Sequence, residues 1–231
     1  HDPVAHPAAG SDLAPDAVRA LEEEIRALAK QKDAVILAHN YQLPEVQRVA
    51  DHVGDSLQLA ITGKQVPQST IVFCGVHFMA ESACVLAPGK RVLLPNLSAG
   101  CSLADSITPE SLEDWKERYP GHAVVTYVNS TAEVKALSDV CCTSANAASV
   151  VRSLPEKKIL FTPDRNLGAW VKAKVPEKEV VVYDGACPVH DVLRSSNVEK
   201  VKRDRPEAVI IAHPECRADA LEIADEVCST T

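Results

Sequence analysis

The chain has 231 residues, of which 46% are apolar and only 4% aromatic, and its 24 basic and 32 acidic residues give a net charge of −8. This acidic balance argues against a nucleic-acid backbone as the main partner. No apolar run approaches the roughly 20 residues that span a bilayer, and residues 1–16 lack the charged and apolar regions of a signal peptide. We therefore expect a soluble, cytoplasmic protein that binds neither nucleic acid nor membrane.

The predicted elements begin after residues 1–12, a lead-in rich in His, Pro, Ala and Gly that we expect to be disordered. A helix is expected from Asp16 onward, since apolar residues recur there at helical spacing: Val18, Leu21, Ile25 and Leu28. Strand-like apolar runs follow at 34–38, 70–74, 91–94, 123–128, 158–161, 179–183 and 208–212. Helical patterns lie at 45–52, 55–63, 78–86, 109–117, 131–138, 144–153, 189–195 and 217–227. This alternation indicates an α/β fold with parallel sheets covered on both faces.

Eight cysteines lie at positions 74, 84, 101, 141, 142, 187, 216 and 228, with no C-x-x-C pair among them. Disulfide frameworks belong mainly to small secreted domains, so we expect these cysteines to be reduced. Cys74, Cys84 and Cys141 lie inside apolar strands or helices, where a small buried side chain is the plainest interpretation. The cysteine pattern does not predict a zinc ribbon or a thioredoxin-type redox motif.

Three segments resemble one another: AVILAHN from residue 34, AVVTYVN from 123 and AVIIAHP from 208, with starts 89 and 85 residues apart. Each is an apolar strand that ends in polar side chains. Chance similarity of Ala- and Val-rich strands is the alternative explanation. A true repeat predicts three α/β/α sub-domains at 1–101, 102–187 and 188–231, the last incomplete. Ligands bind beyond the carboxyl ends of parallel strands, so we expect these ends to share one polar pocket.

Two cysteines follow the same period, since Cys101 and Cys187 are 86 residues apart. Each follows a small-residue turn that contains glycine and precedes a predicted helix. A helix N-terminus lowers the pKa of a thiol, and such thiolates are good metal ligands. The repeat predicts a third cysteine at about position 273, beyond the last residue of this sequence.

Eight segments, in order from about residue 34 to 230, closely resemble the quinolinate synthase A family: ILAHNYQLPEVQ, VADHVGDSLQLA, FCGVHFMAESA, VLLPNLSAGCSLAD, TYVNSTAEVKA, CTSANA, GACPVHD and AHPECRADALEIAD. The resemblance implies three α/β/α sub-domains around a pseudo-threefold axis. It also implies a [4Fe-4S] cluster with three cysteine ligands and one open iron. Cys101 and Cys187 match two ligand positions, whereas the third ligand of the family belongs to a segment that this sequence lacks.

The resemblance implies a transferase of NAD and pyridine nucleotide biosynthesis. The family condenses iminoaspartate with dihydroxyacetone phosphate and releases phosphate and water to form quinolinate, with L-aspartate oxidase as a supplier of iminoaspartate. The cluster acts as a Lewis acid in this reaction. With the third ligand missing, we expect this chain by itself to be poorly active. The alternative is a non-catalytic α/β protein that binds a cluster or dicarboxylates.

The resemblance also assigns proton-transfer and positioning roles. Tyr41 is expected to transfer protons near the open iron, and His39 to position substrate, although the two could instead cap the end of a strand. Glu215 is the expected general base, with His213 beside it, although most lone glutamates are solvated. His190, three residues after Cys187, is expected near the cluster, with a helix-surface histidine as the alternative.

The remaining candidates are expected to bind the substrate carboxylates and phosphate. Ser56 and Ser144 each precede a predicted helix, where a serine is most often only an N-cap but where free N–H groups also bind anions. Tyr127 and Asn129 are expected to hydrogen-bond a carboxylate. The resemblance assigns substrate binding to two further residues near the end of the sequence, Ser229 and Thr230.

Overall fold

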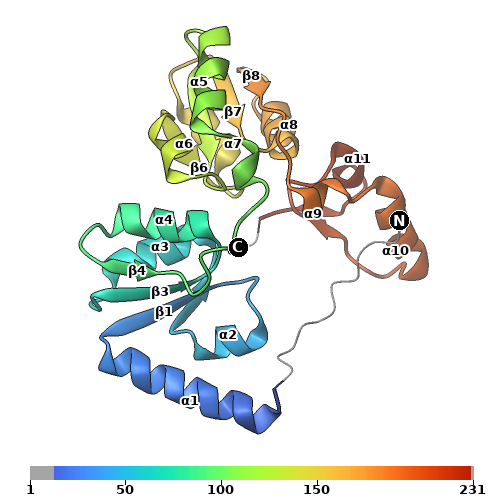
Figure 1. The fold of residues 1–231 in the computed structure, drawn as a ribbon. Helices are drawn as coiled ribbons and strands as arrows, with labels where there is room; N and C mark the ends of the chain where they lie inside the picture. The colour runs from blue at the N-terminus through green and yellow to red at the C-terminus, as the bar shows by residue number, and fades with distance from the viewer. Residues whose placement is uncertain (1–12, 230–231) are drawn as a thin grey trace. The chain divides into compact units, whose positions relative to one another are not determined.

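The computed structural model describes residues 13–229, so the lead-in at 1–12 and the candidate Thr230 lie outside the described residues. The chain divides between Ala99 and Gly100 into two compact units (Figure 1). Each unit holds a four-stranded parallel sheet with helices beside it. The predicted α/β class with parallel sheets is therefore confirmed. The predicted boundaries of three sub-domains stay predictions.

The first unit consists of α1 (Pro15–Gln31), β1 (Ala34–His39), α2 (Pro44–Val49), β2 (His52–Gly54), α3 (Ser56–Gln65), β3 (Thr70–Cys74), α4 (His77–Leu86) and β4 (Arg91–Leu93). Its sheet has the order β2-β1-β3-β4. The central strands β1 and β3 are buried because apolar side chains fill both of their faces, among them Leu37, Ile71 and Phe73.

Helix α1 forms as the apolar spacing predicts, over 17 residues. Pro15 begins it at a position where proline costs no helical hydrogen bond. Its apolar stripe is not fully buried, however, because Leu21, Ile25 and Leu28 remain 42–50% exposed. None of the helices between residues 13 and 229 has the length and apolar content of a transmembrane segment.

The second unit begins with η1 (Ala104–Ser106), α5 (Pro109–Arg118), β5 (Ala123–Tyr127), α6 (Ala132–Ala136), β6 (Val140–Cys142), α7 (Ala147–Ser153), β7 (Lys158–Thr162), α8 (Arg165–Lys174) and β8 (Glu179–Val182). Its sheet has the order β6-β5-β7-β8, so both sheets follow the same topology. The chain continues through α9 (Pro188–Asp191), α10 (Ser195–Asp204), β9 (Ile211–Ala212), α11 (Ala218–Leu221) and β10 (Glu226–Val227). Strands β9 and β10 form a separate two-stranded parallel sheet.

Several predicted boundaries are wrong. The expected helix at 217–227 is instead the short helix α11 followed by strand β10, and the expected strand at 208–212 is only β9. The edge strands β2 and β6 span three residues each, too few to show an alternating pattern in the sequence. Helix α8 was also not expected, because Asn166 and Gly168 lower the helical propensity of its sequence.

An aspartate contact recurs in all three segments of the repeat. The backbone N–H of Ile36 donates to Oδ2 of Asp51 at 2.8 Å, and the N–H of Asp51 donates back to the Ile36 carbonyl at 2.8 Å. The same two-way contact, always 15 residues apart, joins Val124 with Asp139 and Ile210 with Asp225. Each contact links the first strand of a segment to the start of the next strand. This shared geometry argues against a chance similarity of the three strands.

Substitution of Asp139 by alanine is expected to destabilise the second unit. The Val124 N–H lies on a fully buried residue of the central strand and would lose its 2.7 Å acceptor. An unsatisfied buried donor costs about 1–3 kcal/mol, measurable as a lower free energy of unfolding in urea. Asp225→Ala is the matched control, with a smaller expected loss, because Ile210 is only half-buried and water can reach its N–H. Equal losses in the two variants would contradict this account.

Substitution of Gly168 by alanine is expected to destabilise the packing of α8 on the sheet. A Cβ at this position would lie 2.4 Å from Cγ1 of Val182 and 3.0 Å from Cδ1 of Phe161. Alanine gains about 1 kcal/mol in helical propensity, but overpacking of a stiff β-branched neighbour costs about 1–3 kcal/mol. We expect a net loss in thermal unfolding, whereas Gly89→Ala should have little effect because no atom lies within 4 Å of its added Cβ. A Gly168→Ala protein as stable as the parent would refute the packing argument.

Candidate active site

Polar side chains gather in the second unit beyond the carboxyl ends of its strands. Tyr127 is the last residue of β5, and Ser144 follows β6 by two residues. Asp164 follows β7 and precedes α8, and Cys187 precedes α9. His213 and Glu215 then follow β9. The carboxyl ends of parallel strands are where α/β proteins bind their ligands.

Glu215 lies at the centre of this group. The residue is only 2% exposed, which excludes the solvated surface glutamate considered above. Its Oε2 atom lies 2.8 Å from Nδ1 of His190 and 3.8 Å from Nδ1 of His213. The phenol of Tyr127 also donates a hydrogen bond to this carboxylate. A buried carboxylate needs a charged partner, and His190 supplies one.

His190 contacts two partners through the same ring nitrogen. Nδ1 lies 2.8 Å from the Glu215 carboxylate and 3.1 Å from Sγ of Cys187. Burial lowers the pKa of His190, but the hydrogen bonds and charges of Cys187 and Glu215 outweigh it and raise the pKa to about 10. Burial alone would raise the pKa of Glu215, yet the hydrogen bond and charge of His190 lower it overall. At neutral pH the two therefore form an ion pair, so His190 is not a surface histidine.

His213 is held in a different protonation state. Its Nδ1 accepts a hydrogen bond from the backbone N–H of Glu215 at 3.3 Å, and its Nε2 lies 3.1 Å from Oγ of Ser144. An accepting Nδ1 leaves the proton on Nε2, which donates to the serine. Burial lowers the pKa of His213, and the cationic His190 lowers it further against the opposing charge of Glu215. The rings of His190 and His213 are 5.0 Å apart, so a neutral and a charged imidazole lie side by side.

Asp164 was not predicted as part of this site. It is fully buried, and its carboxylate accepts the backbone N–H of Leu167 at 2.7 Å and that of Cys187 at 3.0 Å. Burial raises the pKa of Asp164 to about 6, although these two N–H groups oppose the shift. The aspartate thus caps α8 and fixes the loop that carries Cys187. An aspartate three residues before Leu167 is an N-cap pattern, which the sequence could have revealed.

Asn166 was missed as well, and it supports Glu215 from the backbone side. Its Nδ2 donates to the Glu215 carbonyl at 3.0 Å and to Oδ1 of Asp191 at 2.9 Å. Asp191 is in turn paired with Arg165 at 2.9 Å. These contacts join α8, α9 and the segment after β9 into one polar network. A lone asparagine in a helix carries no sequence signal for such a role.

All eight cysteines are free. Cys101 and Cys187 are both half-buried and pack against the same apolar cluster of the second unit. The expected lowering of the thiol pKa is wrong for Cys101. Burial raises it, the N–H groups of Ala104 and Leu103 only partly oppose this, and the charges of Cys187 and Glu215 raise it further.

Two of the three cysteines expected in the core are exposed, namely Cys84 and Cys141. Cys84 lies on the outer face of α4, and Cys141 lies on the edge strand β6, where one face is open to solvent. Cys74 is half-buried on β3. The apolar context of these cysteines in the sequence therefore did not decide their burial.

The proposed substrate residues of this unit are only partly brought together. Tyr127 is buried, and burial followed by the charge of Glu215 raises its pKa well above the usual value. Ser144 is also buried and contacts His213, but it is not an N-cap, because Asn146 takes that position for α7. Asn129 and Ser229 are half-buried on the loops after β5 and β10.

Three predicted residues lie in the first unit, at the carboxyl ends of β1 and β2. Nδ1 of His39 accepts the backbone N–H of Tyr41 at 3.2 Å, and the rings meet edge to face at 4.8 Å. Burial lowers the pKa of His39, whereas Tyr41 is 67% exposed. These contacts close the end of β1, and the substrate role of the two residues stays a prediction. Ser56 is the first residue of α3 and not its cap, since Asp55 accepts the Gln58 N–H at 2.7 Å.

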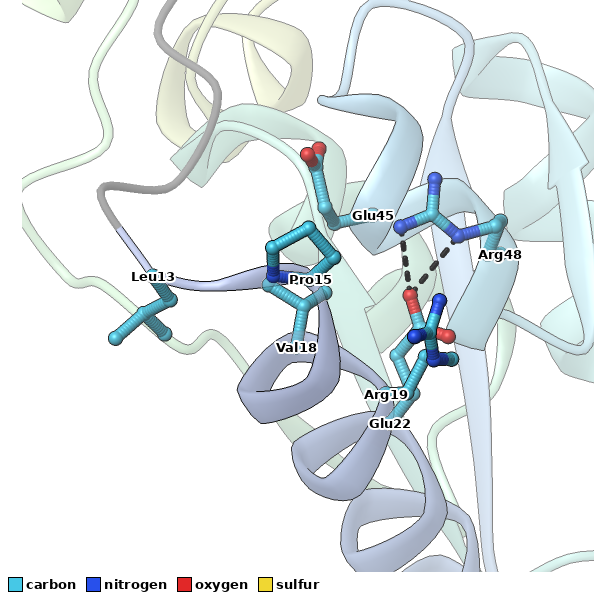
Figure 2. Close-up of a pocket in the computed structure, with 7 residues that line it drawn as sticks. All are labelled: Leu13, Pro15, Val18, Arg19, Glu22, Glu45 and Arg48. Carbon is cyan, nitrogen blue, oxygen red and sulfur yellow. Dashed lines mark hydrogen bonds and ion pairs between the residues drawn. The ribbon is translucent and has the colours of Figure 1, made fainter.

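A hollow of about 460 Å³ lies elsewhere in the first unit, between the start of α1 and α2 (Figure 2). Its lining includes an ion pair in which Arg48 contacts Glu22 at 2.8 Å, drawn with dashed lines. None of the predicted site residues lines this hollow. The ion pair of this hollow is partly exposed, whereas the groups around Glu215 are buried or half-buried and have strongly shifted pKa values. Active sites are typically formed by groups of the second kind, so the hollow is not the candidate active site.

The donor atoms of Cys187, His190 and Glu215 all lie within 4.8 Å of one another. Sulfur, imidazole and carboxylate are all metal-ligating groups, so this part of the site can hold a metal. Cys101 packs against the same apolar cluster as Cys187, and the charge of Cys187 raises the pKa of Cys101. This arrangement fits a site to which both thiols contribute. The residues present are therefore compatible with a metal cluster.

Comparison with known proteins agrees with this chemistry. Residues 23–231 match the family described as Quinolinate synthetase A protein. The quinolinate synthase of Thermodesulfovibrio yellowstonii is 52% identical over 209 residues, which cover 90% of this chain and 69% of that protein. Those of Caldicellulosiruptor bescii and Pelobacter propionicus are 51% and 55% identical, over 92% and 91% of this chain and 70% and 69% of their own length. The chain therefore belongs to the quinolinate synthetase A family.

Proposed function

We propose that this protein is a quinolinate synthase that condenses iminoaspartate with dihydroxyacetone phosphate, releases phosphate and water, and so supplies quinolinate for NAD biosynthesis. The observation that carries the proposal is the buried cluster of Glu215, His190 and His213 beside Cys187, in a chain of this family. The reaction requires enol formation, imine formation and dehydration, each of which moves protons. Glu215 offers an anionic group, His190 a cationic group and His213 a neutral group for these transfers.

Glu215 is the proposed general base. Its carboxylate stays ionised at neutral pH because His190 lowers its pKa, and burial keeps water from competing for the proton that it takes. The cationic His190 is suited to hold the negative charge of a carboxylate or phosphate. His213 presents a neutral imidazole with its Nε2 toward Ser144, which orients that hydroxyl for substrate.

Cys101 and Cys187 are the proposed ligands of a [4Fe-4S] cluster, with a third cysteine expected from a segment that this sequence lacks. When bound, the cluster supplies a Lewis acid that polarises a substrate oxygen. Asp164 holds the Cys187 backbone in place through its 3.0 Å hydrogen bond, so it orients this ligand without touching the cluster.

In the second unit, Tyr127, Asn129, Ser144 and Ser229 are proposed to bind a substrate carboxylate or phosphate, and Thr230 is assigned the same role. In the first unit, this role is proposed for His39, Tyr41 and Ser56. Tyr41 is also the proposed proton donor of the first unit, because its side chain is exposed at the carboxyl end of β1. A cytoplasmic location and the supply of iminoaspartate by L-aspartate oxidase complete the proposal.

The test has two parts that separate catalysis from binding. The protein, extended by the segment that carries the third family cysteine, is purified without oxygen and reconstituted with iron and sulfide. It is then given iminoaspartate and dihydroxyacetone phosphate, and quinolinate is measured by chromatography. In parallel, quinolinate is titrated into protein without iron and its binding is followed by calorimetry. We expect both product formation and binding. Binding without any product from cluster-loaded protein would favour the non-catalytic alternative. The absence of both product and binding would overturn the proposal.

A further inference from the structure

Three side chains of different metal-ligating types, Cys187, His190 and Glu215, lie close together. Nδ1 of His190 is 3.1 Å from Sγ of Cys187 and 2.8 Å from Oε2 of Glu215, and all three atoms lie within 4.8 Å of one another. Sulfur, imidazole nitrogen and carboxylate oxygen is a donor set typical of zinc and other borderline divalent ions. The set differs from an iron–sulfur site, which would use Cys101 and Cys187 and neither of the other two residues.

We propose that Cys187, His190 and Glu215 bind a single borderline divalent ion such as Zn²⁺ when no cluster is present, and that this ion competes with the cluster for Cys187. The ion would replace the proton that His190 shares with the sulfur and the carboxylate. Ligands of tetrahedral zinc lie about 2.0–2.3 Å from the metal, which places them about 3.3–3.6 Å from each other. The two separations from Nδ1 of His190, 3.1 Å to Sγ of Cys187 and 2.8 Å to Oε2 of Glu215, are about half an ångström shorter, so the ring would move back slightly to admit the ion.

Two independent features support a built site. Glu215 is buried, so a positive ion beside its carboxylate would offset the cost of burying this charge. The ligands are also held from behind, as metal ligands commonly are. Asp164 accepts the Cys187 N–H at 3.0 Å, and Asn166 donates to the Glu215 carbonyl at 3.0 Å.

The single ion and the iron–sulfur cluster compete for the same ligand, Cys187. A thiolate of Cys187 that is bound to a single ion is not free to ligate an iron of a cluster. A prebound zinc ion therefore blocks cluster assembly without entering the reaction. Cys101 takes no part in the single-ion site, which separates the two kinds of metal binding experimentally.

Cobalt is the probe, because Co²⁺ takes the same ligands as Zn²⁺ and its absorption reports them. Iron-free protein is titrated with Co²⁺ without oxygen. We expect one ion per chain, with a thiolate charge-transfer band in the near ultraviolet and the visible bands of a tetrahedral site. Cys187→Ser should lose the charge-transfer band. His190→Gln should weaken Co²⁺ binding by more than roughly 10–100-fold, which is the usual loss when a residue that only hydrogen-bonds to a metal ligand is removed.

Cys101→Ser is the matched control, since it should bind Co²⁺ as the parent does. One equivalent of Zn²⁺ should bleach the cobalt spectrum and slow later reconstitution with iron and sulfide. The proposal is overturned if His190→Gln binds Co²⁺ with full affinity, or if Cys101→Ser loses the spectrum as completely as Cys187→Ser. His190→Gln and Cys101→Ser decide the matter even if Cys187→Ser fails to fold. None of these readouts depends on quinolinate formation, so they fail or succeed separately from the proposed reaction.

Discussion

Replacement of Glu215 by glutamine is expected to lower quinolinate formation by about 10²–10⁴-fold, the usual loss when a general base is removed. Glutamine keeps the size of the side chain but cannot take a proton. The fall should appear in kcat more than in KM, because the base acts mainly in the transition state. The measurement is the rate of quinolinate formation by anaerobic, cluster-loaded protein that includes the segment with the third family cysteine.

The same variant has a second readout that does not depend on activity. The pKa of His190 is raised to about 10 partly by its hydrogen bond to Glu215 and by the charge of that carboxylate. In Glu215→Gln we expect this pKa to fall toward the ordinary histidine value, which NMR titration of the imidazole would show. Glu207→Gln, on the exposed loop after α10, is the control that should change neither the rate nor the titration. A Glu215→Gln protein with parental turnover would remove Glu215 from the mechanism.

Replacement of Cys101 by serine is expected to abolish quinolinate formation and to leave the fold intact. Serine has nearly the same shape, but its hydroxyl is a poor ligand for iron, so the cluster should not assemble. The visible charge-transfer absorption of the reconstituted protein should disappear together with product formation. Circular dichroism should match that of the parent protein, because the half-buried Cys101 side chain only borders the apolar cluster.

Cys84→Ser is the control for this experiment, since Cys84 is exposed on α4 and has no role in the proposed mechanism. It should keep both the absorption and the activity. Parental absorption together with parental turnover in Cys101→Ser would refute the ligand assignment. Loss of absorption with retained turnover would instead separate the cluster from catalysis.

Much of the fold could be predicted because its central strands are buried on both faces. Runs such as 70–74 are continuous apolar segments, and the observed strand β3 has these bounds. The elements that were missed lie at sheet edges or have weak local propensity. The two-residue strand β10 exists only because β9 lies beside it, so no local pattern could reveal it.

The candidate site was predicted in its residue types but not in its contacts. His213 and Glu215 were recognised as polar residues that follow an apolar strand, and His190 by its spacing from Cys187. Asp164 and Asn166 were missed because their roles depend on hydrogen bonds to residues 23 and 49 positions away. Such partners are neighbours only after the strands have paired.

The sequence by itself determined the α/β class and the family, because these depend on local patterns and on ordered motifs. Only the tertiary structure decided the protonation states of the site. Whether a histidine is cationic or neutral depends on what is packed against it: His190 contacts a buried carboxylate, whereas His213 accepts a backbone N–H. Burial and the field of neighbouring charges are properties of the folded chain, and here they make one histidine an ion and the other a neutral donor.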